Sequence, residues 1–493
     1  MMNTATPRAA WRTFAIVAAV HCLVVMNDTV VFVALPSIGR MLGLAPADLG
    51  WVMNAYLLSL GGFLLVGGRL ADRFGRRRVL IAGLIGMSLA SALAALAWTG
   101  PVLIGARAAQ GIAGALVAPA AMSAIADIFR DTSERAKATG LLGGVSGIAG
   151  SVGALAGAGL TELGWRATFW FCVPTAALLA ALVRRHLPDR RGDCALPDML
   201  AATAFTGGVS LILLTITGIG IRPAAVTALT ATGGVAALAA AWHRQRTARD
   251  PLLPQALTRS ASTVRGIGLN AVLGFGLFGG FLIVTLFLQV LHGLDPLPAA
   301  AWMLPISGAM FAGSLTAVRL LAHMPPQRVL RGALTVQAIG LGCWAVATHA
   351  DAGMPGYGVA GALWGLGVGA SLASAFVWAT RDVPRPAQGA AAGAVNTALQ
   401  VGGAAGVAVL GWTASASGGV SDSGVVQAIA GAAALMVVGI AVTGPRWSAR
   451  PVTIPPELAT APAAETFDRI VDAGVRLDNP KARQEWPACE LNC

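Results

Sequence analysis

The chain has 493 residues, of which 56% are hydrophobic and only 11% charged, whereas typical soluble domains carry about 25% charged residues. Its formal net charge is +12, a balance that can indicate binding to nucleic acid. The hydrophobic fraction excludes an ordinary soluble globular protein, and the placement of the basic residues gives their charge a different explanation.

The apolar residues form fourteen runs, and each run is long enough to cross a hydrocarbon layer of about 30 Å as a helix. The first run follows residues 1–12 without the cleavage site of a secretory signal peptide. We therefore predict an all-α polytopic membrane protein. The expected spans are 13–36, 49–67, 79–98, 101–126, 138–161, 166–184, 198–218, 223–242, 265–291, 297–318, 330–349, 356–378, 387–413 and 423–444.

Most basic residues fall in every second connection between these runs. The other connections hold only Arg40, Arg166 and Arg222, while Arg107 lies inside a run. Because basic loops remain on the cytoplasmic side, both termini are expected in the cytoplasm, and the protein is expected in the cell (plasma or inner) membrane. This topology explains the positive charge, so no nucleic-acid partner is expected.

The sequence contains no pattern typical of an enzyme or a metal site. The six cysteines lack metal-ligand spacing and do not suggest disulfides. The chain has no nucleophile elbow and no phosphate-binding loop. We expect no enzymatic activity, no metal and no cofactor, so transport would draw its energy from an ion or substrate gradient.

Two charged side chains lie well inside predicted spans, where each costs at least about 2.5–3.5 kcal/mol. Asp28 lies about 12 Å from the membrane surface expected near Pro36, and Arg107 lies roughly 9 Å from the one near Pro101. The two charges are therefore expected at similar depth. Their cost indicates a functional role, although Asp28 as a structural polar contact and Arg107 as a clamp on backbone carbonyls remain alternatives.

Several motifs resemble one transporter family. The connection Gly68–Leu80 reads GRLADRFGRRRVL, which is similar to the loop signature of the major facilitator superfamily, and RAAQGIAGA at Arg107–Ala115 resembles its helix 4 motif. Trp165–Pro174, Leu286–Pro305 and Ala394–Gly411 also resemble its drug:proton antiporter branch, which has fourteen helices rather than twelve.

This resemblance implies two six-helix bundles related by an axis along the membrane normal, two helices inserted between them, and a substrate site between the bundles at mid-membrane. We expect a cytoplasmic N-terminus at 1–12, an N-terminal bundle at 13–186, inserted helices at 187–262, a C-terminal bundle at 263–444, and a disordered cytoplasmic tail at 445–493.

The resemblance also assigns Gly68, Asp72, Arg73 and Gly75 to a latch that holds the bundles in one access state. A glycine at position 75 permits a tight turn. A carboxylate at position 72 can stabilise a neighbouring helix amino terminus by about 0.3–1 kcal/mol. The alternative is that the arginines of this loop only set the topology.

The first and fourth helices are neighbours in the family, so we expect Asp28 and Arg107 to form a pair, directly or through water. Protonation of Asp28 would then release Arg107 and couple a proton to a change in the cavity. The sequence departs from the family here: Asn27 holds the usual aspartate position, Asp28 follows one residue later, and Phe32 replaces an asparagine.

Other polar residues in the spans are candidates for the substrate cavity, with interhelical hydrogen bonding as the alternative. They are Asn27, Gln110, Gln289, Asn396 and Gln400.

Small residues form a stripe on the fifth run, at alternating spacings of four and three residues: Gly143, Gly147, Gly150, Ala154 and Gly157. The residues assigned to helix packing are Gly147, Gly150, Gly153 and Gly157. Such a stripe favours a close helix contact that can slide or rock. Ordinary helix packing is the alternative, and the usual proline of this helix is absent.

The sequence thus predicts a secondary transporter that exports a small amphipathic organic compound (a drug, antibiotic or secondary metabolite) in exchange for protons by alternating access. Its expected partners are this compound, protons and the lipid bilayer, and it is expected to be a monomer. The alternatives are an uncoupled facilitator or importer of the same fold, and a transport-deficient membrane sensor that uses the polar tail.

Overall fold

The structure is a computed structural model that describes residues 7–44, 46–129, 132–188, 198–219, 222–248, 251, 253, 257, 260–350, 353–383, 387–415 and 419–443. The chain divides into two units, Met1–Thr443 and Gly444–Cys493. The second unit, which contains the tail predicted to be disordered, lies outside the described residues.

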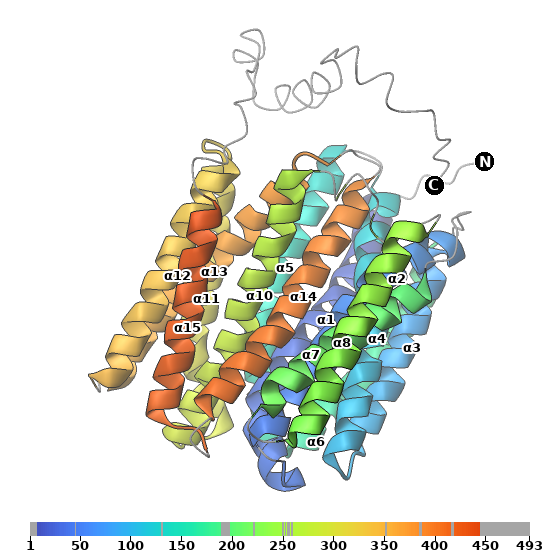
Figure 1. Cartoon of the computed structure of the whole chain (residues 1–493). Coiled ribbons are helices and arrows are strands. Elements are labelled where there is room, and N and C mark those ends of the chain that lie inside the picture. The colour runs from blue at the N-terminus through green and yellow to red at the C-terminus, as the bar shows by residue number, and fades with distance from the viewer. Residues whose placement is uncertain are drawn as a thin grey trace, which may run out of the picture. The chain divides into compact units, whose positions relative to one another are not determined.

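Within the described ranges, the regular elements are fourteen long helices and one π-helical turn, η1, that continues α10 (Figure 1). The helices are α1 Pro7–Leu42, α2 Pro46–Phe74, α3 Arg76–Ala95, α4 Gly100–Ile128, α5 Thr132–Glu162, α6 Trp165–His186, α7 Met199–Gly218, α8 Ala224–Thr247, α10 Ala261–Leu286, η1 Phe287–Leu291, α11 Pro296–Leu321, α12 Pro326–His349, α13 Gly353–Thr380, α14 Gln388–Ala414 and α15 Asp422–Val442.

These helices confirm the predicted all-α membrane fold. Thirteen of the fourteen described helices are long and apolar enough to cross a membrane by length and composition. The helix that is not among these thirteen is α5. Several helices extend past the predicted apolar runs: α2, for example, continues through Arg69 and Asp72 to Phe74. Hydropathy marks only the lipid-facing length, whereas backbone hydrogen bonding continues into the polar ends.

The same set of neighbours occurs twice along the chain. In the first half, α2 packs on α4, α3 packs on α4 and α6, and α1 packs on α5; in the second half, α11 packs on α13, α12 packs on α13 and α15, and α10 packs on α14. The fold is therefore two six-helix bundles, α1–α6 and α10–α15. The bundles meet where α2 packs on α14 and α5 packs on α11.

Glycines bring the helices of the second bundle into close contact. A Cβ atom added to Gly402 on α14 would lie 1.9 Å from the carbonyl oxygen of Ala271 on α10, and one added to Gly369 on α13 would lie 1.8 Å from that of Met310 on α11. No side chain fits at either distance, so these two contacts require glycine.

The inserted helices lie against the seam between the bundles. Helix α7 packs on both α2 and α14, while α8 packs on α7. Thr206 of α7 faces Gly62 of α2 so closely that a Cβ atom at Gly62 would overlap its hydroxyl. Helix α7 is thus in contact with both bundles.

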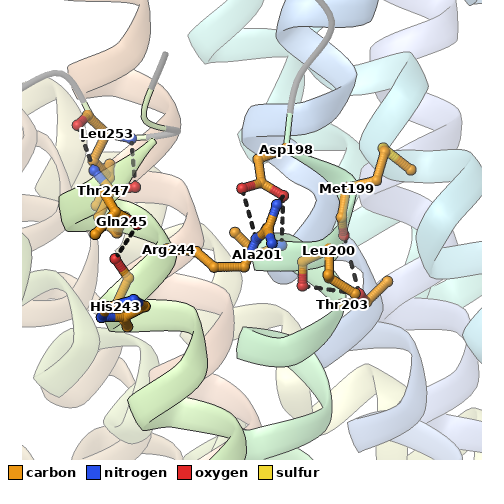
Figure 2. Close-up of polar contacts among 10 residues, drawn as sticks. All are labelled: Asp198, Met199, Leu200, Ala201, Thr203, His243, Arg244, Gln245, Thr247 and Leu253. Atoms are coloured by element: carbon orange, nitrogen blue, oxygen red, sulfur yellow. Dashed lines mark hydrogen bonds and ion pairs between the residues drawn. The ribbon is translucent and has the colours of Figure 1, made fainter. Parts of the chain in front are cut away.

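One ion pair joins the neighbouring ends of α7 and α8 (Figure 2). Asp198 accepts a hydrogen bond from the Ala201 amide at 2.9 Å, and its Oδ2 lies 3.0 Å from Nε of Arg244. Desolvation of Asp198 opposes its ionisation, but the hydrogen bonds from Arg244 and the Ala201 amide outweigh it and lower the pKa of this carboxyl. The side chain of Asp198 is 13% exposed and that of Arg244 is 44% exposed, so solvent screens the pair.

We expect Asp198→Asn to lower the stability of the folded protein by less than about 1 kcal/mol at neutral pH, because asparagine keeps the helix cap but loses the charge. The folded-state pKa is depressed, so the contribution is present above the unfolded pKa of about 3.9 and disappears as pH falls through the folded value. Thermal unfolding of both proteins from pH 7 to pH 3 tests this. A difference that does not shrink at acidic pH would contradict it.

Candidate functional site

Arg107 of α4 is fully buried and is held by neighbours on α2 and by its own helix. Its Nε donates to the carbonyl oxygen of Val52 at 3.1 Å, its Nη1 donates to Oε1 of Gln110 at 3.0 Å, and its Nη2 lies 3.9 Å from the sulfur of Met53. The guanidinium also lies over the ring of Tyr56, 4.2 Å from the centroid. A desolvated cation–π contact of this kind contributes about 2 kcal/mol.

The hydrogen bonds continue from Arg107 towards α3. Gln110 donates from Nε2 to the Ser91 hydroxyl at 2.7 Å, and Ser91 donates to the Met87 carbonyl oxygen at 2.7 Å. Gln110 and Ser91 are both fully buried. This chain fixes the orientation of the guanidinium, because the amide of Gln110 is bonded at both ends.

Tyr56 of α2 is the residue next to both predicted charges. Its hydroxyl interacts electrostatically with the carboxyl of Asp28, and its ring lies beneath Arg107. By hydrogen-bond geometry, the Tyr56 hydroxyl, Asp28 Oδ1 and Asn27 Nδ2 are buried without a partner in the described part of the chain. We call the six residues Asn27, Asp28, Tyr56, Ser91, Arg107 and Gln110 the Arg107 cluster.

The structure thus brings Asp28 and Arg107 into one electrostatic environment. The direct form of the predicted pair is not seen, since no ion pair joins the two side chains among those described. Arg107 instead directs its donors to Val52 and Gln110. Adding or removing a proton at Asp28 would change the charge that faces Tyr56 and Arg107 in a site sheltered from water.

A cavity of about 420 Å³ lies between the two bundles, at the end where α1, α7, η1 and α14 terminate and α2 begins. We call this the Pro36 end. The volume falls in the range of small-molecule sites. The lining residues are Pro36, Gly39, Arg40, Leu44, Leu49, Gly50, Trp51, Asn54, Thr217, Leu282, Leu286, Gln289, Val290, Val407, Ala408, Gly411, Trp412, Ser415, Gly419 and Val420.

Gln289, one of the candidates for a substrate cavity, lines this cavity from η1. Its Nε2 donates to the carbonyl oxygen of Val33 on α1 at 3.0 Å, so it joins the two bundles. Single π-helical turns are frequent at functional sites because they re-aim side chains out of helical register. Here the turn carries Gln289 into the cavity.

The other predicted cavity residues do not line this cavity. Asn27 and Gln110 belong to the Arg107 cluster, and Asn396 is exposed and donates to Ala392 of its own helix at 3.0 Å. Gln400 packs beside Gly61 where α14 meets α2.

Asn54 was not identified from the sequence. It is 1% exposed, it lines the cavity, and neither atom of its amide has a hydrogen-bond partner among the described residues. Leaving such groups unpaired costs about 1–3 kcal/mol. One uncharged asparagine in an apolar run gives no signal at the sequence level, and only its burial beside a cavity distinguishes it.

The predicted latch residues lie at the junction of α2 and α3. Gly75 separates the two helices with φ 94°, a conformation that favours glycine, so the predicted tight turn is present. Gly68 faces Pro119 of α4, Asp72 is exposed, and the guanidinium of Arg73 lies 5.7 Å from the centre of the Phe74 ring. The latch itself remains a proposal.

The small-residue stripe of α5 faces α1. A Cβ atom on Gly153 would lie 2.2 Å from the hydroxyl of Thr29, and one on Gly157 would lie 2.7 Å from Cα of Val30. Gly150 lies at ordinary contact distance from Thr29. Gly147 lies outside the residues whose side-chain surroundings are described.

We expect Gly157→Ala to destabilise the protein by about 1–3 kcal/mol, because its added methyl group would meet the backbone of Val30 and force α5 away from α1. Gly159→Ala is the matched control: no atom lies within 4 Å of its added Cβ, and alanine favours the helix. Thermal unfolding should show opposite signs for the two variants. Equal midpoints would mean that α1 and α5 do not need close contact.

The comparisons of this chain with known protein families and known proteins agree with one another. The Major Facilitator Superfamily model matches residues 17–407. The puromycin resistance protein pur8 of Streptomyces alboniger is 41% identical over 82% of this chain and 81% of its own length. The tetracenomycin C resistance and export protein of Streptomyces glaucescens is 32% identical over 81% and 75%, and the multidrug efflux pump LfrA of Mycolicibacterium smegmatis is 30% identical over 83% and 82%.

Solved structures of distant sequence share the fold. A bacterial homologue of the human lysosomal transporter Spinster, in an inward-facing and unoccupied conformation, superposes with a TM-score of 0.63 at 14% identity, covering 89% of this chain and 97% of that chain. The xylose transporter XylE from E. coli, partially occluded and inward-open, gives 0.61 at 13% identity, covering 88% and 98%.

Proposed function

Because the chain belongs to the major facilitator superfamily, we propose that it exports a small amphipathic organic compound from the cell in exchange for protons, by alternating access. The relatives above support the direction and the substrate class, since their names describe resistance to, and export of, antibiotics and drugs. Puromycin and tetracenomycin C are therefore the first compounds to test.

The observation that carries the proton coupling is the Arg107 cluster. A carboxyl at Asp28, a buried guanidinium at Arg107 and the hydroxyl of Tyr56 share one water-poor site inside the first bundle. In such surroundings the charge on Asp28 strongly affects the energy of its neighbours. Loading a proton onto Asp28 would weaken its attraction to Arg107, and releasing the proton would restore that attraction.

The cavity supports alternating access. It lies at the Pro36 end, while farther along the same helices α2 and α14 are in direct contact: Thr397 donates to the carbonyl oxygen of Gly61 at 2.8 Å, and Gly393 packs against Leu65. Transport would require this contact to open and the Pro36 end to close. We propose that Gly68, Asp72, Arg73 and Gly75 stabilise one of these two states.

We further propose the topology and boundaries of the transporter. The alternation of basic loops puts both termini in the cytoplasm and the Pro36 end outside the cell membrane. The bundles would comprise 13–186 and 263–444, with 187–262 inserted between them. The protein would work as a monomer, because both bundles and the cavity come from one chain.

The test is transport by the purified protein in liposomes with an imposed pH gradient, using puromycin, tetracenomycin C and a panel of other amphipathic drugs. We expect accumulation that requires the gradient and stops when an ionophore dissipates it. Transport that ignores the gradient would indicate an uncoupled facilitator. Absence of transport, together with a cellular effect lost on deletion of Gly444–Cys493, would indicate a sensor.

A further inference from the structure

We propose that the cavity at the Pro36 end binds planar aromatic compounds that are neutral or anionic and discriminates against cations. Asn54 and Gln289 would supply its hydrogen-bonding groups, and Arg40 would set its charge preference. This inference rests on the proposed function, because it names the substrate class of the same transporter.

The lining of the cavity carries one formal charge among its described residues. That charge is the guanidinium of Arg40, near the end of α1, and no carboxylate from the described part of the chain lines the cavity. Asp48, the acidic residue nearest along the chain, precedes the lining residue Leu49 but does not itself line the cavity. A bound anion would therefore be attracted by the lining, and a bound cation would be repelled.

Arg40 differs from the other two arginines predicted at this end. Arg166 donates to the carbonyl oxygen of Ala97 at 2.8 Å and lies 4.3 Å over the ring of Trp165, and Arg222 packs along Gly218. Arg40 has no ion pair within the described ranges and lines the cavity instead. The alternative role, a favourable charge at the C-terminus of α1, would not depend on a ligand.

The uncharged polar groups of the cavity are placed to bind a ligand. Asn54 is buried with both amide atoms unpartnered, so a ligand that offers a carbonyl or an N–H group would satisfy it. Gln289 presents the second amide from η1, held by its bond to Val33. A carboxylate can accept from Nδ2 of Asn54, whereas an amide can accept there and also donate to Oδ1 of Asn54.

The remaining walls favour flat apolar groups. Trp51 and Trp412 line the cavity together with Leu282, Leu286 and Val407. Indole rings stack on aromatic ligands with large apolar contact areas. A ligand with an aromatic body and one polar or acidic group therefore matches the lining in both shape and chemistry.

Three probes that share a naphthalene ring and differ in the charge of their substituent test the charge preference: 2-naphthoate, 2-naphthamide and (2-naphthyl)trimethylammonium. Binding to the full-length protein in nanodiscs is measured by equilibrium dialysis at low ionic strength, with empty nanodiscs correcting for partition into lipid. We expect naphthoate to bind about 10-fold more tightly than the ammonium probe, with naphthamide between them. The ratio should fall as salt is added, because Arg40 is exposed.

Variants of single residues test which side chains produce the charge preference and the binding. Arg40→Gln should bring the ratio of the two charged probes close to 1, whereas the control Arg222→Gln should leave it unchanged. Asn54→Leu should weaken naphthoate and naphthamide by about 10-fold and leave the ammonium probe little changed, because that probe makes no hydrogen bond, and thermal unfolding checks that each variant is folded. The proposal is overturned if no probe binds, if the ammonium probe binds as tightly as naphthoate, or if the ratio survives Arg40→Gln.

Transport assays separate this inference from the proposed function. Proton-driven export without a charge preference at the cavity would overturn the inference and leave export standing. A charge preference lost in Arg40→Gln, in a protein that transports nothing, would support the binding site and refute export.

Discussion

Asp28→Asn is expected to abolish proton-driven export, with a loss of at least about 100-fold in initial rate, while the protein remains folded. Asparagine has nearly the same shape as aspartate but cannot release a proton, so Tyr56 and Arg107 would face a side chain of constant charge. A 100-fold loss corresponds to about 2.7 kcal/mol in the barrier. The measurement is uptake into liposomes under a fixed pH gradient.

The matched control for this variant is Asp382→Asn. Asp382 is an exposed carboxylate outside the Arg107 cluster, paired with Arg381 at 3.2 Å, and its neutralisation should leave transport unchanged. If Asp28→Asn transports at the wild-type rate under the same gradient, Asp28 does not couple the proton.

Removal of Arg107 is expected to have the second large effect, on stability as well as on transport. Arg107→Gln would remove the donor to Val52 and the cation over Tyr56, and would leave the charge on Asp28 without its neighbour. Each buried acceptor that loses its donor costs about 1–3 kcal/mol, and Asp28 also loses the cation that faces it. We expect a strongly lowered unfolding temperature and no measurable transport.

A double-mutant cycle tests whether this cost comes from Asp28. Adding Asp28→Asn to Arg107→Gln removes the charge left without its neighbour and should recover at least about 1 kcal/mol of stability, although not transport. Additive effects would mean that the two side chains do not interact. Arg107→Lys keeps the charge but cannot reproduce the planar fork, so its transport should fall about 10-fold or more.

The helices were predictable from the sequence because few backbone conformations are stable inside a membrane. A spanning segment must satisfy every backbone group internally, so long apolar runs become helices. Asp28 and Arg107 were found for the related reason that charges in such runs are costly. Both arguments use one residue and its solvent, and neither requires knowledge of neighbours in space.

The uncharged polar residues could not be placed in this way. Tyr56 and Asn54 lie two residues apart in one apolar run, yet one belongs to the Arg107 cluster and the other to the cavity. Asn396 was expected in the cavity but is exposed. Hydropathy does not reveal how a helix is rotated about its axis, so it could not show which way this side chain points. The position of Trp51 in the cavity lining could not be predicted for the same reason.

One departure from the family pattern gains a structural explanation. Phe32 occupies a position where the family commonly has asparagine, and its ring stacks on Phe278 of α10 with 6.3 Å between centroids and 24° between planes. The substitution replaces a polar side chain by an aromatic contact between α1 and the second bundle. It therefore changes how the bundles meet, while Asp28 remains available in the first bundle.

The most direct test of the central claim, that Asp28 exchanges a proton for the transported compound, is proton release on substrate binding. A compound shown to be transported is added to purified protein in a weakly buffered solution, and the pH is recorded. The account predicts that the wild type releases protons on binding and that Asp28→Asn binds the compound without releasing them. Equal release from both proteins, or none from the wild type, would contradict it.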